Sequence, residues 1–225
     1  MAVLNDVWRL LTFRSRQQEL DGWAWPHLGV GLGTTWLVGI GRWWDDPSAS
    51  ALQKTGLGSV AYVLVLALVL FLVAWPLGPR SWSYRHVLTF VSLTAPPALL
   101  YAIPVERLVS MPVATQLNLW FLLVVAVWRV ALLVFYFMRH AALGWWRTLV
   151  AVLLPLSSIV IALSMLNLSR GVVEIMGGLR DPSADRLANE IVLMLGLLAF
   201  MAAGPLLVAY LVGIGIAWLA RRRPS

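Results

Sequence analysis

One charged residue, Arg129, lies near the centre of a long apolar run, residues 117–138. A cation at the centre of a bilayer costs at least about 2.5–3.5 kcal/mol on insertion scales, so it usually faces protein or a water-filled cavity. No Asp or Glu occurs within the long apolar runs of this sequence. The partner of Arg129 must therefore be a hydroxyl, a backbone carbonyl, water or an anionic ligand. The chemistry open to it is electrostatic capture of an anion.

Three further polar residues share the helical face of Arg129. Asn118 and His140 are each 11 residues away from it, and Tyr136 is seven residues away. At about 100° per residue, these spacings place the three side chains within roughly 20° of the direction of Arg129. The run is therefore predicted to carry one polar stripe through the depth of a membrane.

Helix-breaking residues fall mid-way in three other apolar runs. They are Pro96, Pro97, Pro155, Gly204 and Pro205. Proline removes a backbone donor and frees carbonyl groups of the preceding turn. The hydroxyl candidates near these breaks are Thr89, Ser92 and Ser157. Together these residues predict a polar midplane site that binds or passes a small anionic or amphiphilic ligand, such as a lipid, with the broken helices as hinges. The alternative is that the prolines are packing kinks and that Arg129 is a structural staple.

No other pattern predicts a metal, a cofactor or a catalytic reaction. His27, His86 and His140 are expected at one membrane face, but no two of them are close in sequence, and the chain has no cysteine. The spacings of zinc proteases, serine hydrolases and phosphate-binding loops are absent. We therefore expect a protein that is not an enzyme. The pair Gly29 and Gly33 is typical of a close helix–helix contact.

The elements that must position these residues are helices in lipid. Hydrophobic residues make up 60% of the chain and charged residues 12%, against about 45–50% and about 25% in soluble domains. Spanning lipid takes about 20 apolar residues per helix, and six runs approach or exceed this length: 26–41, 57–77, 86–103, 117–138, 146–166 and 191–219. The predicted fold class is an all-α, polytopic transmembrane bundle of about six spanning helices. Residues 23–220 would form its single domain and residues 221–225 a basic cytoplasmic tail.

Residues 1–22 are predicted to form an amphipathic segment. Apolar side chains recur at helical spacing from Val3 to Leu11, and Arg9, Arg14 and Arg16 lie among and after them. This pattern is typical of a helix that lies on an anionic leaflet. The alternative is a helix that packs on the cytoplasmic end of the bundle.

The basic residues predict the orientation in the membrane. With the N-terminus cytoplasmic, 10 Lys and Arg residues fall in inside segments and 6 in outside segments. Both termini are therefore expected in the cytoplasm, and the chain in the inner (plasma) membrane. The chain has a net charge of +7, and its charged residues lie mostly between the apolar runs. The expected partners are therefore anionic lipid head groups. A protein is a further candidate partner, and no nucleic acid is expected.

Two stretches resemble parts of uncharacterised bacterial multi-pass inner-membrane proteins. They are GIGRWWDDP, residues 39–47, and YAIPVER, residues 101–107. The general build, an amphipathic start before a compact hydrophobic bundle, is loosely similar to Yip1-type membrane proteins. That resemblance implies about five spans and a role in membrane organisation or trafficking, and it carries no site residues over. The leading interpretation is ligand binding or transport, and the alternative is a non-catalytic scaffold, assembly or trafficking factor.

Overall fold

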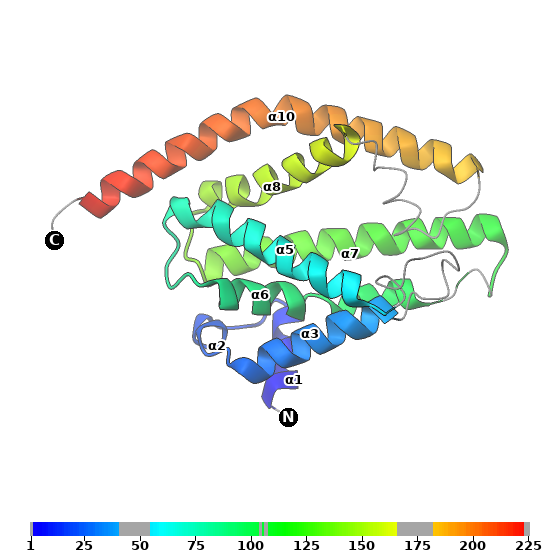
Figure 1. Cartoon of the computed structure of the whole chain (residues 1–225), viewed down its shortest axis with the longest axis horizontal. Helices are drawn as coiled ribbons and strands as arrows, with labels where there is room; N and C mark the ends of the chain where they lie inside the picture. The colour runs from blue at the N-terminus through cyan, green and yellow to red at the C-terminus, as the bar shows by residue number, and fades with distance from the viewer. Residues whose placement is uncertain (1, 41–54, 104, 106–107, 166–181, 223–225) are drawn as a thin grey trace.

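The computed structural model describes residues 2–40, 55–103, 105, 108–165 and 182–222 of the chain. Every regular element within these residues is a helix. In chain order they are α1 (Ala2–Leu11), α2 (Gln17–Asp21), α3 (Trp25–Ile40), α5 (Leu57–Ala74), the 3-10 helix η1 (Trp75–Leu77), α6 (Tyr84–Leu93), the 3-10 helix η2 (Pro96–Ala102), α7 (Met111–Arg139), α8 (Trp145–Met165) and α10 (Pro182–Arg222). The predicted all-α class is confirmed for this part of the chain (Figure 1).

Four helical segments are long and apolar enough to cross a membrane. They are Leu57–Leu77, Gln116–Arg139, Trp145–Ala162 and Leu193–Arg221. They coincide with the second, fourth, fifth and sixth predicted spans. Most of their side chains are not buried inside the protein; in the segment from α10, only 11% of the most apolar window is buried. Apolar side chains that point outward are what lipid contact requires, and this agrees with a multi-pass membrane protein.

The first and third predicted spans do not form long continuous helices. Helix α3 has 16 residues. The third is split, because α6 ends at Leu93 and η2 begins at Pro96. Pro96 and Pro97 have no backbone N–H to continue the α-helical hydrogen bonding, so the chain changes helix type there. Helices α8 and α10 instead continue without interruption through Pro155 and Pro205, and Figure 1 shows α10 as a long arch.

Helix α6 lies at the centre of the described fold. All seven residues from Val87 to Leu93 are buried, and both α3 and α5 pack against α6. Helix α10 packs on α8, away from α6. The helix with the densest packing is therefore the broken one, and the longest helix is the most exposed.

The glycines of α3 make its contacts at positions other than the predicted pair. A Cβ added at Gly29 or Gly33 meets nothing within 4 Å, so the close contact predicted for this pair does not occur among the described residues. A Cβ at Gly31 would instead lie 2.2 Å from Ser92 Oγ in α6, and one at Gly39 would lie 2.8 Å from the backbone of Gly56. The apolar run gave no signal of which glycine faces α6.

Helix α1 packs on the bundle with one part of its apolar face. Val7 and Leu10 are buried, whereas Leu4 and Trp8 are exposed. The indole Nε1 of Trp128 donates a hydrogen bond to the Leu11 carbonyl at 3.0 Å. Val3 and Leu11 also pack, partly buried, against the core, so packing against the bundle, the alternative from the sequence, accounts for most of the apolar face.

Candidate functional site

Arg129 lies against the break in α6. Its Nε donates a hydrogen bond to the carbonyl of Thr94, 3.1 Å away. Thr94 is the residue that follows the last turn of α6. In a continued α-helix its carbonyl would accept from Ala98, but the N–H of Ala98 bonds to Ala95 instead. The 3-10 geometry imposed by the two prolines therefore releases the carbonyl that Arg129 uses.

The other predicted stripe residues divide into separate environments. Tyr136 is fully buried, with its ring stacked 4.1 Å from that of Phe90 and 4.9 Å from that of His140. Asn118 is partly exposed, as is Ser157 of α8. The predicted stripe therefore consists of an arginine within α7 and, towards the end of that helix, an aromatic cluster around Tyr136.

The hydroxyls predicted near Arg129 bond within their own helix. Thr89 Oγ1 donates to the carbonyl of Arg85 at 2.8 Å, and Ser92 Oγ donates to that of Thr89 at 2.9 Å. Both hydroxyl hydrogens are therefore used in hydrogen bonds to carbonyl groups within the buried helix α6. The midplane ligand role of this residue set stays a prediction.

Two histidines meet where α6 begins and α7 ends. The rings of His86 and His140 lie 5.2 Å apart. Both Nε2 atoms and the Tyr136 hydroxyl are buried without a hydrogen-bond partner among the described residues. His140 Nδ1 lies 2.8 Å from Asp21 Oδ1, an ion-pair distance, although the carboxylate is off the direction of a hydrogen bond. Within the described residues, no three His, Cys, Asp or Glu side chains could hold a metal ion.

His140 is held in its neutral form by its surroundings. Burial, and then the neighbouring His86, lower the pKa of His140 below its ordinary value of 6.5, against the opposing effect of Asp21. Its imidazole therefore carries no charge at neutral pH.

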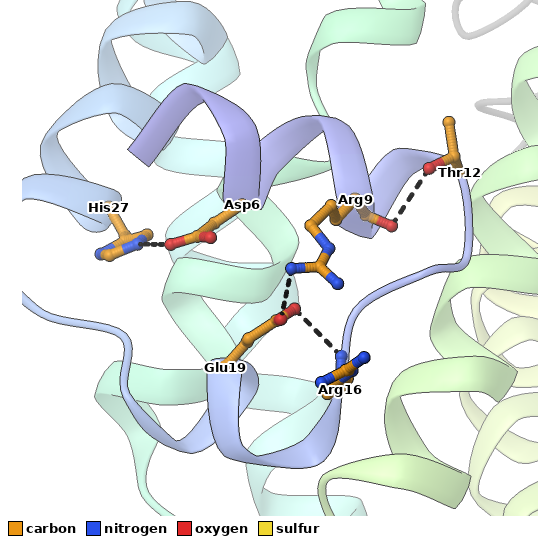
Figure 2. Close-up of polar contacts among 6 residues, drawn as sticks. All are labelled: Asp6, Arg9, Thr12, Arg16, Glu19 and His27. Atoms are coloured by element: carbon orange, nitrogen blue, oxygen red, sulfur yellow. Dashed lines mark hydrogen bonds and ion pairs between the residues drawn. The ribbon is translucent and has the colours of Figure 1, made fainter. Parts of the chain in front are cut away.

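The N-terminal segment is fastened by a short polar network (Figure 2). Arg9 Nη1 pairs with Glu19 Oε1 at 2.6 Å, and the other Glu19 oxygen accepts from the backbone N–H of Arg16 at 3.1 Å. His27 Nε2 lies 3.1 Å from Asp6 Oδ2. These contacts tie α1 to α2 and to the start of α3, and they place the side chains of α2 at one end of the bundle.

A polar cavity of about 510 Å³ opens at this end. It is lined by Arg16, Gln17, Gln18, Asp21, Arg80 and Ser81. The first four residues come from α2 and its start, and the other two come from the loop 78–83. This loop turns at Gly78, whose φ of 77° favours glycine, and the Arg80 N–H donates to the Ala141 carbonyl at 2.9 Å.

Three other arginines at this end of the bundle have contacts of their own. Arg9 is in an ion pair, the Arg85 guanidinium lies 5.6 Å from the centre of the Trp25 ring, and Arg147 donates to the Leu77 carbonyl at 3.3 Å. The guanidinium groups of Arg16 and Arg80 form no ion pair with any described residue. In the sequence Arg80 counted only as a signal of membrane orientation, and Arg16 counted also as part of the amphipathic N-terminal segment. Arg16 and Arg80 lie in one cavity because two segments more than 60 residues apart in sequence come together, and no local sequence pattern predicts that contact.

Comparisons of this chain with protein-family models, curated proteins and solved structures find no match. The function must therefore be inferred from the geometry of the chain itself.

Proposed function

We propose that this protein is a multi-pass membrane protein that binds the phosphate-bearing head group of an amphiphile, a phospholipid, in the cavity between α2 and the loop 78–83. The observation that carries the proposal is the presence in one polar cavity of two arginines, Arg16 and Arg80, that form no ion pair with a described residue. Guanidinium groups match phosphate oxygens in geometry and charge, and such hydrogen bonds are stronger than neutral ones. An anionic group would offset the two positive charges.

The position of the cavity supports a lipid as the source of the phosphate. Trp25, Trp75 and Trp145 are exposed near helix ends close to the cavity. Exposed tryptophans concentrate at the head-group level of a bilayer. The excess of arginine at the same end favours the cytoplasmic leaflet. A phospholipid could place its phosphate in the cavity and its chains along the apolar helices.

The proposal includes six crossings of the membrane, with both termini in the cytoplasm of a cell with an inner (plasma) membrane. Arg80 bonds to Ala141 at the end of α7, whereas η2 leads towards Met111 at its start. Helix η2 also packs on α7, so the segment α6–η2 runs beside much of α7, which is one of the four long apolar helices. At about 1.5 Å and 2.0 Å per residue, α6 and η2 measure about 15 Å and about 14 Å, which together approach the ~30 Å of a bilayer core. A break at membrane depth is tolerated where protein surrounds it, and α6 is buried.

Helix α3 is proposed to cross beside α5. Its end lies at the start of α5, because Trp36 Nε1 donates to the Thr55 carbonyl at 2.8 Å. Its start lies at the opposite end, where Arg85 covers Trp25. With 16 residues it is about 24 Å long. This length is shorter than the ~30 Å hydrocarbon core of a bilayer, and local thinning of the bilayer compensates for such a difference at a modest energetic cost.

Single cysteines would test the six crossings, since the chain has none of its own. In intact cells, a membrane-impermeant maleimide is expected to label Leu108→Cys and to leave Ala2→Cys and Ser81→Cys unlabelled until the cells are opened. Labelling of positions 81 and 108 from the same side would contradict a crossing by α6–η2. Labelling of position 2 in intact cells would contradict the cytoplasmic N-terminus.

Removing both cavity arginines is expected to weaken lipid binding at least tenfold. Each charge-assisted hydrogen bond contributes about 1.5–3 kcal/mol, and 1.4 kcal/mol is a factor of ten in affinity. The measurement is calorimetric titration of short-chain phosphatidylglycerol and phosphatidylethanolamine into purified Arg16→Gln/Arg80→Gln protein in neutral detergent. Arg14→Gln is the matched control, because Arg14 is exposed and lies outside the cavity.

Equal affinities of the double variant and the wild type for both lipids would contradict the proposal. That result would favour the alternative role as a membrane scaffold, assembly or trafficking factor. The surface available for such a role is the exposed part of α1, at Leu4 and Trp8.

A further inference from the structure

The cavity carries charges of both signs. Asp21, the last residue of α2, lines it together with the two arginines, and its side chain is 44% exposed. A site that bound only an anion would gain nothing from a carboxylate in its wall, since like charges at short distance repel. Asp21 is therefore the feature of the cavity that phosphate binding leaves unexplained.

Among the groups around Asp21, no described Arg or Lys lies within ion-pair distance of the carboxylate. The closest described group is His140, whose Nδ1 lies 2.8 Å from one carboxylate oxygen. Because burial lowers the pKa of His140, this imidazole is neutral at neutral pH and acts as a dipole beside a full negative charge. Two further titratable groups there, His86 and Tyr136, face the ring of His140. On the cavity side Asp21 shares the wall with Arg16 and Arg80.

We propose that the cavity selects a phospholipid whose head group joins a primary ammonium to its phosphate diester, as in phosphatidylethanolamine. The phosphate pairs with Arg16 and Arg80, and the ammonium pairs with Asp21. This assignment rests on the proposed function, and it gives each charged group of the cavity a partner of opposite sign. The remaining lining side chains, those of Gln17, Gln18 and Ser81, can donate to phosphate and ester oxygens.

A lipid without the ammonium is bound less well by the same geometry. The head group of phosphatidylglycerol brings the phosphate charge but leaves Asp21 beside it without a cation. Electrostatic complementarity of this kind distinguishes ligands through the unfavourable contact as much as through the favourable one. The wild-type protein is therefore expected to bind short-chain phosphatidylethanolamine about tenfold more tightly than short-chain phosphatidylglycerol.

The test compares three carboxylate variants by titration with both short-chain lipids. Asp21→Asn is expected to bring the two affinities within about twofold of each other, by weakening the binding of phosphatidylethanolamine. Asp21→Glu, which keeps the charge, is expected to retain the preference. Asp6→Asn is the matched control, because Asp6 also faces an imidazole, that of His27, but lies outside the cavity. Thermal unfolding of each variant establishes that it is folded.

The outcomes separate this inference from the proposed function. Equal affinities of the wild type for the two lipids, with both lost in the Arg16→Gln/Arg80→Gln protein, would overturn the ammonium assignment and leave phosphate binding standing. An unchanged preference in Asp21→Asn would overturn it in the same way. Absence of binding to either lipid in the wild type would overturn both. Binding of soluble glycerophosphoethanolamine as tight as that of the lipid would overturn the assignment to a membrane lipid.

Discussion

A leucine at position 31 is expected to destabilise the folded protein strongly, whereas a leucine at position 29 leaves its stability nearly unchanged. A Cβ at Gly31 would meet Ser92 Oγ at 2.2 Å, Ser92 Cβ at 2.9 Å and the backbone nitrogen of Leu93 at 3.1 Å. Helix α6 cannot move away, because it is buried from Val87 to Leu93. At Gly29 the same atom meets nothing within 4 Å. Both positions lie in α3, so both variants lose the backbone flexibility of a glycine in the same helix. A difference between them therefore reports the packing of position 31 against α6.

Overpacking a core by a few methylenes costs about 1–3 kcal/mol, and the backbone contact at position 31 places Gly31→Leu at or beyond the upper end of this range. Native stabilities are only about 5–15 kcal/mol. The measurement is the yield of monodisperse protein after detergent extraction, followed by thermal unfolding. Equal yields and melting temperatures for Gly31→Leu and Gly29→Leu would contradict the packing of α3 on α6.

Arg129→Ala is expected to lower the free energy of unfolding by about 1.5–3 kcal/mol, the contribution of a hydrogen bond made by a charged group. The carbonyl of Thr94 is released by the break in α6 and loses its donor in this variant. Thr94 itself is only 5% exposed, so water cannot readily replace the guanidinium. The effect is that of a staple, and phospholipid affinity in the cavity is expected to stay within about twofold of the wild type.

Arg129→Lys serves as the control, because lysine keeps the charge but lacks the Nε donor and the planar fork of arginine. It is expected to be nearly as destabilised as the alanine variant. Calorimetric titration with short-chain phospholipid and thermal unfolding in the same detergent provide both readouts. If Arg129→Ala melts like the wild type but no longer binds phospholipid, the midplane binding site would be favoured over the staple.

The long apolar helices are predictable from sequence because lipid imposes a length and a composition on them. The long apolar segments of α5, α7, α8 and α10 meet both conditions through their own sequence. Helix α6 depends on its neighbours instead. It contains polar residues such as Thr89 and Ser92, and the packed helices around it decide its form. The sequence places a break at Pro96 and Pro97, but it offers no way to distinguish them from Pro155 and Pro205, where the helix continues.

The sequence predicted the type of partner for some side chains, but not which residues would be in contact. The lack of any carboxylate in the apolar runs predicted partners for Arg129 such as backbone carbonyls, and the Thr94 carbonyl is one such partner. The span boundaries predicted His86 and His140 at the same end of the bundle, but the 5.2 Å between their rings depends on how the start of α6 meets the end of α7. The cavity was not predictable, because Arg16 and Arg80 belong to two short segments that meet only in the folded chain.

The most direct test of the central claim, phosphate recognition by the two cavity arginines, is native mass spectrometry of the protein extracted from its own membrane in a mild neutral detergent. The wild type and Arg14→Gln are expected to retain a phospholipid at activation energies that remove detergent and loosely attached lipid. Arg16→Gln/Arg80→Gln is expected to lose this phospholipid under the same conditions. The same phospholipid adducts in all three proteins, or no retained phospholipid in any of them, would contradict the cavity as a head-group site.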